Sequence, residues 1–422
     1  MGVGLSLSSL FREKVSSLKD YRMKNEIEQN VSYPTGFLSF DFLNGTVIHV
    51  KSDDMDFTYN SVGIVDGSMV TVIGRTGCGK TTFIMQSAGE IIRPFETACI
   101  YHDDIEGGIV QSRKEMLLKM KGQELVDHYI ARNSGITAEN FYERIKMIHD
   151  LKMENREAYE YDTGLYDELG NRIIKLEPTV YILDSLALLM PEKYADEEEL
   201  SGQMSTTAAA KTNSSIFRRI IPMLKAANII LFVVNHITED VSISPMQRKK
   251  AQTAYLKPGE SVGGGRVALY VTNLLIRMDD NTKLKETEGF GVHGIVVEVS
   301  ILKSRTCAAG RSVNLIFDYD HGFDKELSLL ILLKDLGIVN MKGAYMSFAN
   351  NEEIGKFTNK NFKEKLKDPE FSKVFAEQAL IGLNMIITKP DEDSLDEDNT
   401  VEDISSSILA MNNKMIMKSA TA

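Results

Sequence analysis

Short apolar runs recur along the chain, and helical patterns separate the early ones. The runs that predict strands span residues 69–73, 98–102, 179–183, 229–234 and 273–277. Strands that alternate with helices form a mainly parallel sheet covered by helices. Two later runs, 295–302 and 312–317, follow one another without a helix, which predicts an antiparallel extension of the sheet. The expected fold class is therefore α/β with a twisted, mainly parallel sheet.

The flanking patterns suggest further units. Residues 1–32 have apolar positions near helical spacing and are followed by a Pro-Gly break, which predicts an N-terminal helical arm before a core at 33–328. An apolar helix near 327–336 opens a small C-terminal α/β domain at 329–388. The charged, turn-rich insertion at 121–178 contains an expected hairpin tip at 167–172, and we assign no chemistry to it.

The composition is that of a globular protein, with 43% hydrophobic and 26% charged residues among 422. The three cysteines, Cys78, Cys99 and Cys307, have neither zinc nor disulfide spacing, which is typical of a reducing compartment. No apolar stretch approaches the roughly 18 residues that span a membrane. We expect a cytoplasmic protein without a membrane partner.

The net charge of −12 would by itself argue against nucleic acid as a partner, because phosphates are neutralised by clustered Lys and Arg. Much of this charge lies in the tail, 389–422, which holds acidic residues from Asp391 to Asp403 with no basic residue among them. The net charge of the whole chain therefore does not describe the charge of the core. The tail is expected to be either a solvated, disordered end or a regulatory segment that competes with an anionic ligand.

A phosphate-binding loop follows the predicted strand at 69–73. The segment reads Gly74-Arg75-Thr76-Gly77-Cys78-Gly79-Lys80-Thr81-Thr82 and fits G-x-x-x-x-G-K-[ST]. Its glycines let backbone N–H groups turn towards phosphates, which side chains would obstruct. Lys80 supplies a positive charge to the terminal phosphates, and the Thr81 hydroxyl is a Mg²⁺ ligand. The expected cofactors are ATP and Mg²⁺.

Polar residues end three of the other predicted strands. Asp184 follows the run at 179–183 and is the candidate Walker B carboxylate that shares a Mg²⁺ ion with Thr81. Glu106, which we favour over Asp103 and Asp104, is the candidate base that orients and deprotonates the attacking water. His236 ends the strand at 229–234 and could sense the γ-phosphate, although a structural histidine is the alternative.

The order of these motifs resembles the RecA-type recombinases, and most closely the UvsX-like recombinases of large phages. The resemblance covers roughly residues 33–350 and includes the Walker segments, Asp-x-Glu at 104–106, Asn-His at 235–236, Gly-Gly-Gly at 263–265 and Lys-Ser-Arg-Thr at 303–306. Residues 343–356 and the acidic C-terminus are similar to bacterial RecA. The resemblance implies a RecA-like ATPase core and a phage-encoded protein in the host cytoplasm.

The resemblance also implies two loops that bind single-stranded DNA, near 191–211 and 237–264. Met204 matches an apolar wedge between nucleotide triplets, and Val241 or Ile243 matches a second wedge; one flexible methionine among many is the alternative for Met204. Glycine-rich helix N-termini bind phosphates. The further DNA-binding candidates are Lys211, Arg248, Lys249, Lys250, Gly264 and Gly265.

Assembly follows from the same resemblance. Lys303 and Arg305 match a basic pair that reaches the ATP of the neighbouring protomer, where cations stabilise charge on the transferred phosphoryl group. The implied function is an ATP-dependent DNA strand-exchange protein that forms helical filaments on single-stranded DNA and pairs it with double-stranded DNA. The N-terminal arm serves polymerisation, and single-strand-binding and mediator proteins are further candidate partners.

Two departures from the family pattern leave details open. Where RecA proteins carry an adenine-stacking tyrosine, this chain reads Val110-Gln111-Ser112-Arg113, so either Arg113 stacks on the base or the base is held loosely. His236 replaces the glutamine of bacterial RecA, as in UvsX-like proteins. Two other functions share the Walker signals: a hexameric helicase with a RecA fold, and an ATP-binding recombination mediator that does not hydrolyse ATP.

Overall fold

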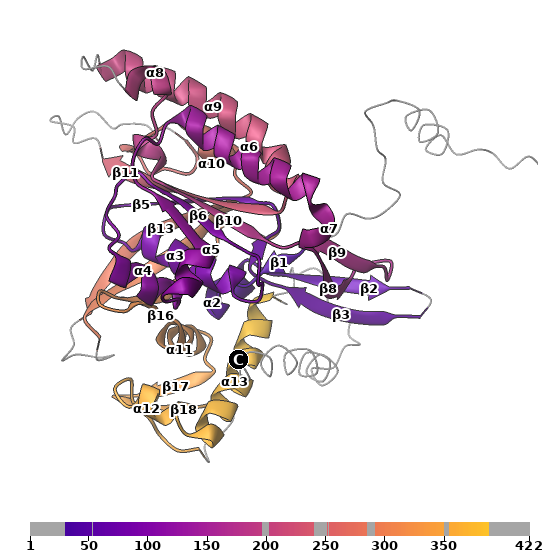
Figure 1. Ribbon diagram of the computed structural model, residues 1–422. Helices are drawn as coiled ribbons and strands as arrows, with labels where there is room; N and C mark the ends of the chain where they lie inside the picture. The colour runs from indigo at the N-terminus through magenta and orange to yellow at the C-terminus, as the bar shows by residue number, and fades with distance from the viewer. Residues whose placement is uncertain are drawn as a thin grey trace, which may run out of the picture.

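A ten-stranded sheet forms the centre of the protein (Figure 1). The computed structural model describes residues 30–52, 54–195, 202–239, 251, 253–284, 292–349 and 354–387. The strand order is β16-β15-β14-β13-β5-β11-β10-β6-β7, and β12 pairs with β11 outside this path. The strands are β5 (Met69–Gly74), β6 (Ile100–Asp104), β7 (Tyr129–Arg132), β10 (Thr179–Asp184), β11 (Ile229–Glu239), β12 (Glu260–Val262), β13 (Leu274–Leu284), β14 (Gly294–Ser304), β15 (Ser312–Asp318) and β16 (Gly322–Asp324).

The sheet has a parallel and an antiparallel half. Pairing is parallel from β13 through β5, β11, β10 and β6 to β7. It is antiparallel from β13 to β14, β15 and β16. The predicted α/β class and the antiparallel extension are both confirmed. All of β5 and β10 is buried, because these parallel strands are covered on both faces, and most of their residues are apolar.

Helices cover both faces of the sheet (Figure 1). One layer holds α6 (Ala138–Glu154), α9 (Gly202–Ala226) and α10 (Val267–Val271), and its apolar side chains form one cluster with alternate residues of β10 and β11. The other layer packs against the opposite side chains of the same strands. Its helices are α2 (Leu38–Leu43), α3 (Lys80–Ile92), α4 (Gln111–Leu118), α5 (Gln123–His128) and α11 (Lys325–Asp335).

Two hairpins extend from the core and lie side by side (Figure 1). They are β2 (Thr46–Lys51) with β3 (Asp56–Ser61), and β8 (Glu160–Tyr166) with β9 (Arg172–Leu176). The Lys51 amide donates to the Glu168 carbonyl at 3.1 Å, which joins the first hairpin to the turn of the second. The hairpin tip expected at 167–172 is therefore present. The remaining short elements of the core are β1 (Ser32–Tyr33), β4 (Ile64–Val65), α7 (Arg156–Tyr159), the 3₁₀ turn Leu186–Leu188 and α8 (Glu192–Ala195).

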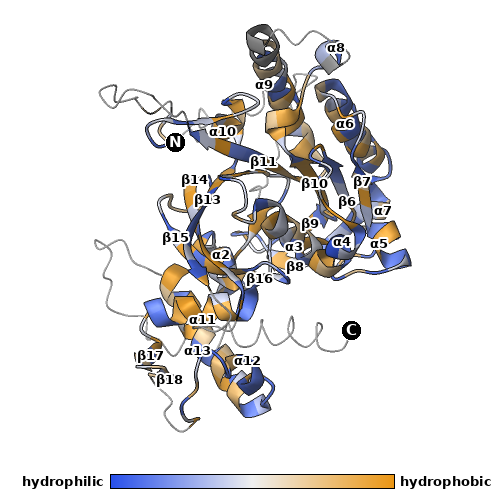
Figure 2. Ribbon diagram, turned by 90° about the vertical axis from the view of Figure 1, so that its left-hand side faces the viewer, coloured by the Kyte–Doolittle hydropathy of each residue, from blue (hydrophilic) through white to orange (hydrophobic). Residues whose placement is uncertain are grey.

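The C-terminal part forms a small α/β unit after α11. It consists of β17 (Val339–Lys342), β18 (Tyr345–Phe348), α12 (Phe362–Lys365) and α13 (Pro369–Ile387). Its centre is an aromatic cluster that includes Phe348, Phe357 and Phe371. Apolar residues dominate α11, as Figure 2 shows by its hydrophobic colours, and this helix packs on both β15 and α13. Among the described residues, no helix combines the length and apolarity needed to cross a membrane.

Several predicted segments differ from the structure or fall outside it. Residues 202–211, expected within a DNA-binding loop, are helical and begin α9. Alanines at 208–210 favour the helix in this stretch. Gly264 and Gly265 lie three and two residues before Val267, the first residue of α10, rather than opening the helix. The described residues do not include 1–29, 196–201, 240–250 or 388–422, and hence exclude Val241, Ile243, Arg248, Lys249, Lys250 and the acidic tail; the side chain of Met204 is also outside the description.

Candidate active site

The phosphate-binding loop joins the end of β5 to the start of α3, and each of its glycines has its own physical reason. A Cβ on Gly74 would lie 2.4 Å from the Met278 carbonyl oxygen of β13, and a Cβ on Gly79 would lie 2.9 Å from the Phe323 ring. Gly79 also caps α3 with a left-handed φ of 82°. Gly77 has a φ of 87° and open space around its Cβ position. Packing therefore requires two of the glycines, while only Gly77 faces open space.

Lys80 is held inside this loop. Its Nζ donates to the carbonyls of Gly74 at 3.1 Å and Arg75 at 2.7 Å. Burial lowers the pKa of Lys80, and the nearby acidic side chains of Asp184 and Glu106 oppose that shift. The ammonium therefore lies within the loop, and a bound anion could replace the two carbonyls as its hydrogen-bond partner.

Thr81 and Asp184 meet as the sequence predicts. The Thr81 hydroxyl donates to Asp184 Oδ2 at 2.5 Å, while Asp184 Oδ1 is buried without a hydrogen-bond partner. Burial raises the pKa of Asp184 to about 6, and the bond from Thr81 works against that rise. A hydroxyl beside a carboxylate oxygen with unused acceptor capacity is a hard donor set, so these two residues fit Mg²⁺.

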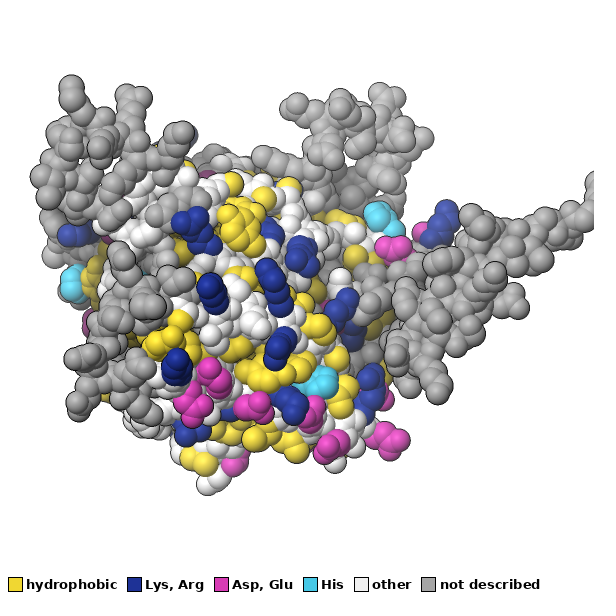
Figure 3. All heavy atoms as spheres, turned by 90° about the horizontal axis from the view of Figure 1, so that it is seen from above, with side chains coloured by type: hydrophobic (Ala, Val, Ile, Leu, Met, Phe, Trp, Pro, Cys, Tyr) yellow, Lys and Arg dark blue, Asp and Glu magenta, His cyan; other side chains and the backbone are white. Residues whose placement is uncertain are grey.

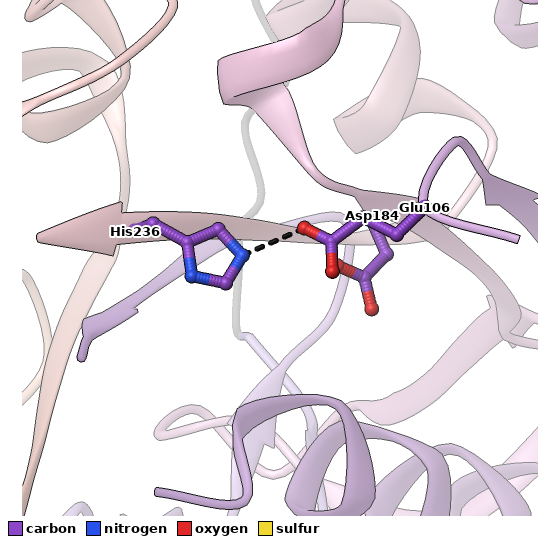
Figure 4. Close-up of side chains that lie close together, drawn as sticks. All are labelled: Glu106, Asp184 and His236. Atoms are coloured by element: carbon purple, nitrogen blue, oxygen red, sulfur yellow. Dashed lines mark hydrogen bonds and ion pairs between the residues drawn. The ribbon is translucent and has the colours of Figure 1, made fainter. Parts of the chain in front are cut away.

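Glu106 and His236 lie next to this pair (Figure 4). His236 Nε2 is 2.7 Å from Glu106 Oε1, and His236 Nδ1 is 3.4 Å from the Thr76 hydroxyl of the phosphate-binding loop. Ligand atoms of Glu106, Asp184 and His236 all lie within 4.8 Å of one another. Four segments distant in the sequence, namely the phosphate-binding loop and the ends of β6, β10 and β11, therefore converge at one edge of the sheet.

Backbone contacts hold the segment that carries Glu106. Asp104 accepts from the Gly107 amide at 2.9 Å, which closes the turn after β6. The Ile105 amide donates to the Asp184 carbonyl at 2.7 Å, so the turn is tied to the end of β10. On β11, the Asn235 side chain donates to the Gly263 carbonyl at 3.0 Å. Ile105 and Asn235, the residues just before Glu106 and His236, are thus tied to the neighbouring segments at Asp184 and Gly263.

A buried ion pair on the other face of β6 escaped the sequence analysis. Asp103 Oδ2 accepts from the Tyr181 hydroxyl at 2.5 Å and from Arg144 Nη2 of α6 at 2.6 Å. Arg144 Nε also donates to the Tyr181 oxygen at 2.9 Å. Asp103 is an alternative to Glu106 as the catalytic base in the sequence, but its side chain is 3% exposed and contacts Arg144 of α6. Its role is to anchor α6 to the sheet.

Lys303 and Arg305 lie at the opposite edge of the sheet from the phosphate-binding loop. Because β14 is antiparallel, Ser304 pairs with Leu274, and Leu274 pairs in turn with Val70 near the start of β5. Lys303 Nζ donates to the carbonyls of Tyr270 and Thr272. Burial and the charge of Arg305 lower the pKa of Lys303. The structure does not bring these two cations to Thr81, Asp184 or Glu106 of the same chain.

Two of the predicted DNA-binding segments meet on α9. The Asn213 amide donates to the Gly264 carbonyl at 3.1 Å, and a Cβ on Gly265 would lie 3.0 Å from Ala210. Beside them is a shallow hollow lined by Ala210, Lys211, Ser214, Ser215, Arg218 and Arg219. Figure 3 shows Lys and Arg side chains spread over the face of the molecule that contains α9. Arg218 and Arg219 were missed, although their helical spacing from Lys211 could have indicated a shared face.

Arg113 does not present a free guanidinium for stacking. Its Nη1 donates to the carbonyls of Tyr319 at 3.1 Å and Asp320 at 2.6 Å, which ties α4 to the turn between β15 and β16. Arg75, another candidate of the phosphate-binding loop, forms an ion pair with Glu239 at the end of β11. Cys78 Sγ donates to the Arg75 carbonyl at 3.0 Å, and the Thr82 side chain is buried in α3.

The fold and the converging Walker residues define a nucleotide-binding α/β protein with a RecA-like core. The chain is similar to the RecA protein of Chloroherpeton thalassium, with 21% identity over 403 residues that cover 91% of this chain and 99% of the relative. RecA of Streptococcus thermophilus is 25% identical over 84% of this chain and 82% of its own length. RecA of Thermotoga maritima is 22% identical over 76% and 73%. No family model matches the chain. These matches support a relationship to the RecA family.

Proposed function

We propose that this protein is an ATP-dependent DNA recombinase that forms helical filaments on single-stranded DNA and exchanges strands with homologous duplex. The observation that supports it most directly is the convergence of the phosphate-binding loop with Glu106, Asp184 and His236 at one edge of the sheet. The similarity to RecA proteins over most of both chains supports a function in DNA strand exchange. The hexameric helicase is less favoured, since the relatives that we compared are all RecA proteins.

In this proposal each side chain at the site has a separate task. Lys80 binds the terminal phosphates, and Thr81 and Asp184 hold Mg²⁺, which would neutralise charge on the phosphates. Glu106 accepts a proton from the attacking water, because its carboxylate is exposed enough to receive water and already accepts a hydrogen bond. His236 bridges Glu106 and Thr76, so a change at the phosphates would alter its contact with the base.

DNA binding is assigned to the face of α9. Lys211, Arg218 and Arg219 present charges along one side of the helix, and the turn of Gly264 and Gly265 packs beside them. Phosphate contacts of this kind bind strands without regard to sequence. Residues 237–264 would complete the interface, and Met204, Val241 and Ile243 would serve as wedges between bases.

Lys303 and Arg305 are proposed to act on the ATP of a neighbouring protomer. They lie at the start of the parallel strands, whereas the phosphate-binding loop lies at their ends, about 15 Å away along β5. A second copy stacked head to tail would place its basic edge against this catalytic edge, as in an open filament. The N-terminal arm would support the same contact.

The finer assignment is a UvsX-like recombinase of phage origin, active in the host cytoplasm. The presence of His236 where bacterial RecA has glutamine supports it. Adenine recognition would not depend on Arg113, because its guanidinium already binds two carbonyls. The acidic tail would compete with DNA for the basic face, and single-strand-binding and mediator proteins would act as partners.

Strand exchange tests the proposal. Wild-type protein is expected to convert homologous DNA in the presence of ATP and Mg²⁺, with DNA-stimulated hydrolysis. Glu106→Gln should lower the hydrolysis rate by about 100-fold or more while nucleotide binding persists. Glu124→Gln, an exposed carboxylate on α5, is the matched control and should leave hydrolysis unchanged.

The alternatives predict different results. Absence of strand exchange by wild-type protein would contradict the recombinase assignment, and rings rather than filaments in electron micrographs would favour a helicase. Negligible hydrolysis by wild type, Lys80→Ala and Glu106→Gln alike would favour a mediator that binds ATP without turnover.

A further inference from the structure

We propose that Glu106, Asp184 and His236 form a binding site for a transition-metal dication, with Zn²⁺ and Co²⁺ preferred over Mg²⁺. Each residue offers one ligand atom, and the three atoms lie within 4.8 Å of one another. Figure 4 shows the three side chains converging. This is the one such group of three that the described part of the chain forms. It differs from the Thr81 and Asp184 pair assigned to Mg²⁺ because it includes an imidazole.

An unsatisfied buried atom points independently to a ligand. Asp184 is 3% exposed, and its Oδ1 has no hydrogen-bond partner, while its Oδ2 accepts from Thr81. A buried carboxylate oxygen without a partner is costly, so it favours a cation that would satisfy it. Glu106 and His236 are partly exposed and can close around an ion by side-chain rotation, because neither is packed in the core.

The donor set selects the kind of ion. Two carboxylates and one imidazole nitrogen suit Zn²⁺, Co²⁺ or Mn²⁺, whereas Mg²⁺ favours oxygen ligands alone. For such a site the affinity rises from Mn²⁺ to Co²⁺, and imidazole is also a good ligand for Zn²⁺. His236 Nε2 now faces Glu106 at 2.7 Å. Binding through Nε2 would move the single ring proton of the neutral imidazole to Nδ1, which lies 3.4 Å from the Thr76 hydroxyl, and the two carboxylates would balance the two positive charges.

The site shares Glu106, Asp184 and His236 with the proposed ATPase but does not depend on that activity. An ion bound by all three residues would occupy the carboxylate needed for Mg²⁺ and the base needed for hydrolysis. We therefore expect Zn²⁺ to inhibit hydrolysis in competition with the Mg²⁺ complex of ATP. Two other histidines, His149 and His321, each pair with a single carboxylate. They provide internal comparisons that lack the third ligand.

The test is a titration of the full-length, nucleotide-free protein without a histidine tag. Co²⁺ is added and followed by its visible absorption, and Zn²⁺ is followed by calorimetry. Wild type is expected to bind one equivalent of each ion saturably. His236→Asn should weaken that binding by at least about tenfold, and Glu106→Gln should weaken it as well. His321→Asn, the matched control, should bind as wild type does.

Three results would overturn the proposal: no saturable binding of one equivalent by wild type, equal binding by wild type and His236→Asn, or equal weakening by His321→Asn. Circular dichroism of each variant shows whether it is folded, and Glu106→Gln provides an exposed second position should His236→Asn fail to fold. Hydrolysis of ATP with Mg²⁺ alone is measured separately. Either the metal site or the proposed ATPase can therefore fail without the other.

Discussion

The two edges of the parallel half of the sheet carry different chemistry. At the carboxyl edge, where the strands end, lie the phosphate-binding loop, two carboxylates and His236 within a few ångströms. At the amino edge, where the strands begin, the Lys303 ammonium and the Arg305 backbone amide donate to backbone carbonyls, away from the carboxylates of the site. The difference shows that one chain holds the parts of the proposed ATPase in two places. In the proposed function, completion of the site would require a second copy.

A single helix supports both edges. Near its centre, Arg144 of α6 pairs with Asp103 at the end of β6. Two turns later, Lys152 Nζ donates to the Glu177 carbonyl at 2.6 Å and to the Thr179 hydroxyl at 3.0 Å, at the start of β10. Both basic side chains serve the fold rather than a ligand. The edges can thus be perturbed separately through the same helix.

The largest effect is expected at the carboxyl edge. Asp184→Asn removes the charge that pairs with Mg²⁺ and should lower kcat for ATP by about 1,000-fold, or about 4 kcal/mol. Steady-state hydrolysis measures it. Asp162→Asn, an exposed carboxylate on β8, is the control. A loss of less than tenfold would mean that the carboxyl edge does not hold the metal.

Loss of the buried anchor should come next. Arg144→Met leaves Asp103 charged and buried without its ion-pair partner, which should cost about 3 kcal/mol of unfolding free energy. Urea denaturation gives the value. Arg172→Met breaks the exposed pair with Asp162 and should change stability little. Equal stability of the two variants would show that α6 does not depend on this contact.

Substitutions at the amino edge should cause a smaller loss of ATP hydrolysis, and mixing with a second variant should partly restore it. Lys303→Ala/Arg305→Ala is expected to reduce DNA-stimulated hydrolysis by about 100-fold, because the charge on the phosphoryl group lacks its partner. An equimolar mixture with Glu106→Gln should recover about a quarter of wild-type activity, since about one interface in four joins two intact edges. Hydrolysis by the mixture no higher than by either variant alone would place the two edges in separate functions.

The last expected effect depends on pH. Burial lowers the pKa of Lys152 to about 7. Between pH 7 and roughly 10.5 the unfolded chain holds a proton that the folded chain lacks, so stability should rise with pH across this window. Lys152→Met should remove about 3 kcal/mol of that rise between pH 7 and pH 9.5. Chemical denaturation at pH 7 and pH 9.5 measures it, and an unchanged slope would contradict the assignment.

The strands were predictable where a single physical requirement decided them. Residues of β5 and β10 are mostly apolar and all buried because both faces are covered, and Asp184 at the C-terminal end of β10 marks the edge. The prediction for β13 stopped at 277, whereas the strand continues to Leu284 because its polar end pairs with β14. Pairing with a distant strand leaves no signal in local hydrophobicity.

The site was predictable to the extent that it follows from strand ends. Glu106, Asp184 and His236 were identified from such positions and Thr81 from the phosphate-binding motif after β5, and the structure brings them together. The contact of Arg144 with Asp103 was not predictable, since 41 residues separate them and neither lies in a motif. The two-edge separation also required the structure, because it depends on the direction of β14.

The direction of β14 has a consequence for assemblies of different lengths. In a head-to-tail stack, every protomer but one would receive the basic pair of a neighbour, and the last would be left with an incomplete site. One incomplete site is a larger fraction of all sites in a short stack than in a long one, so short stacks would have a lower rate of hydrolysis per protomer. The two termini would also differ chemically, so hydrolysis would distinguish one end of the assembly from the other.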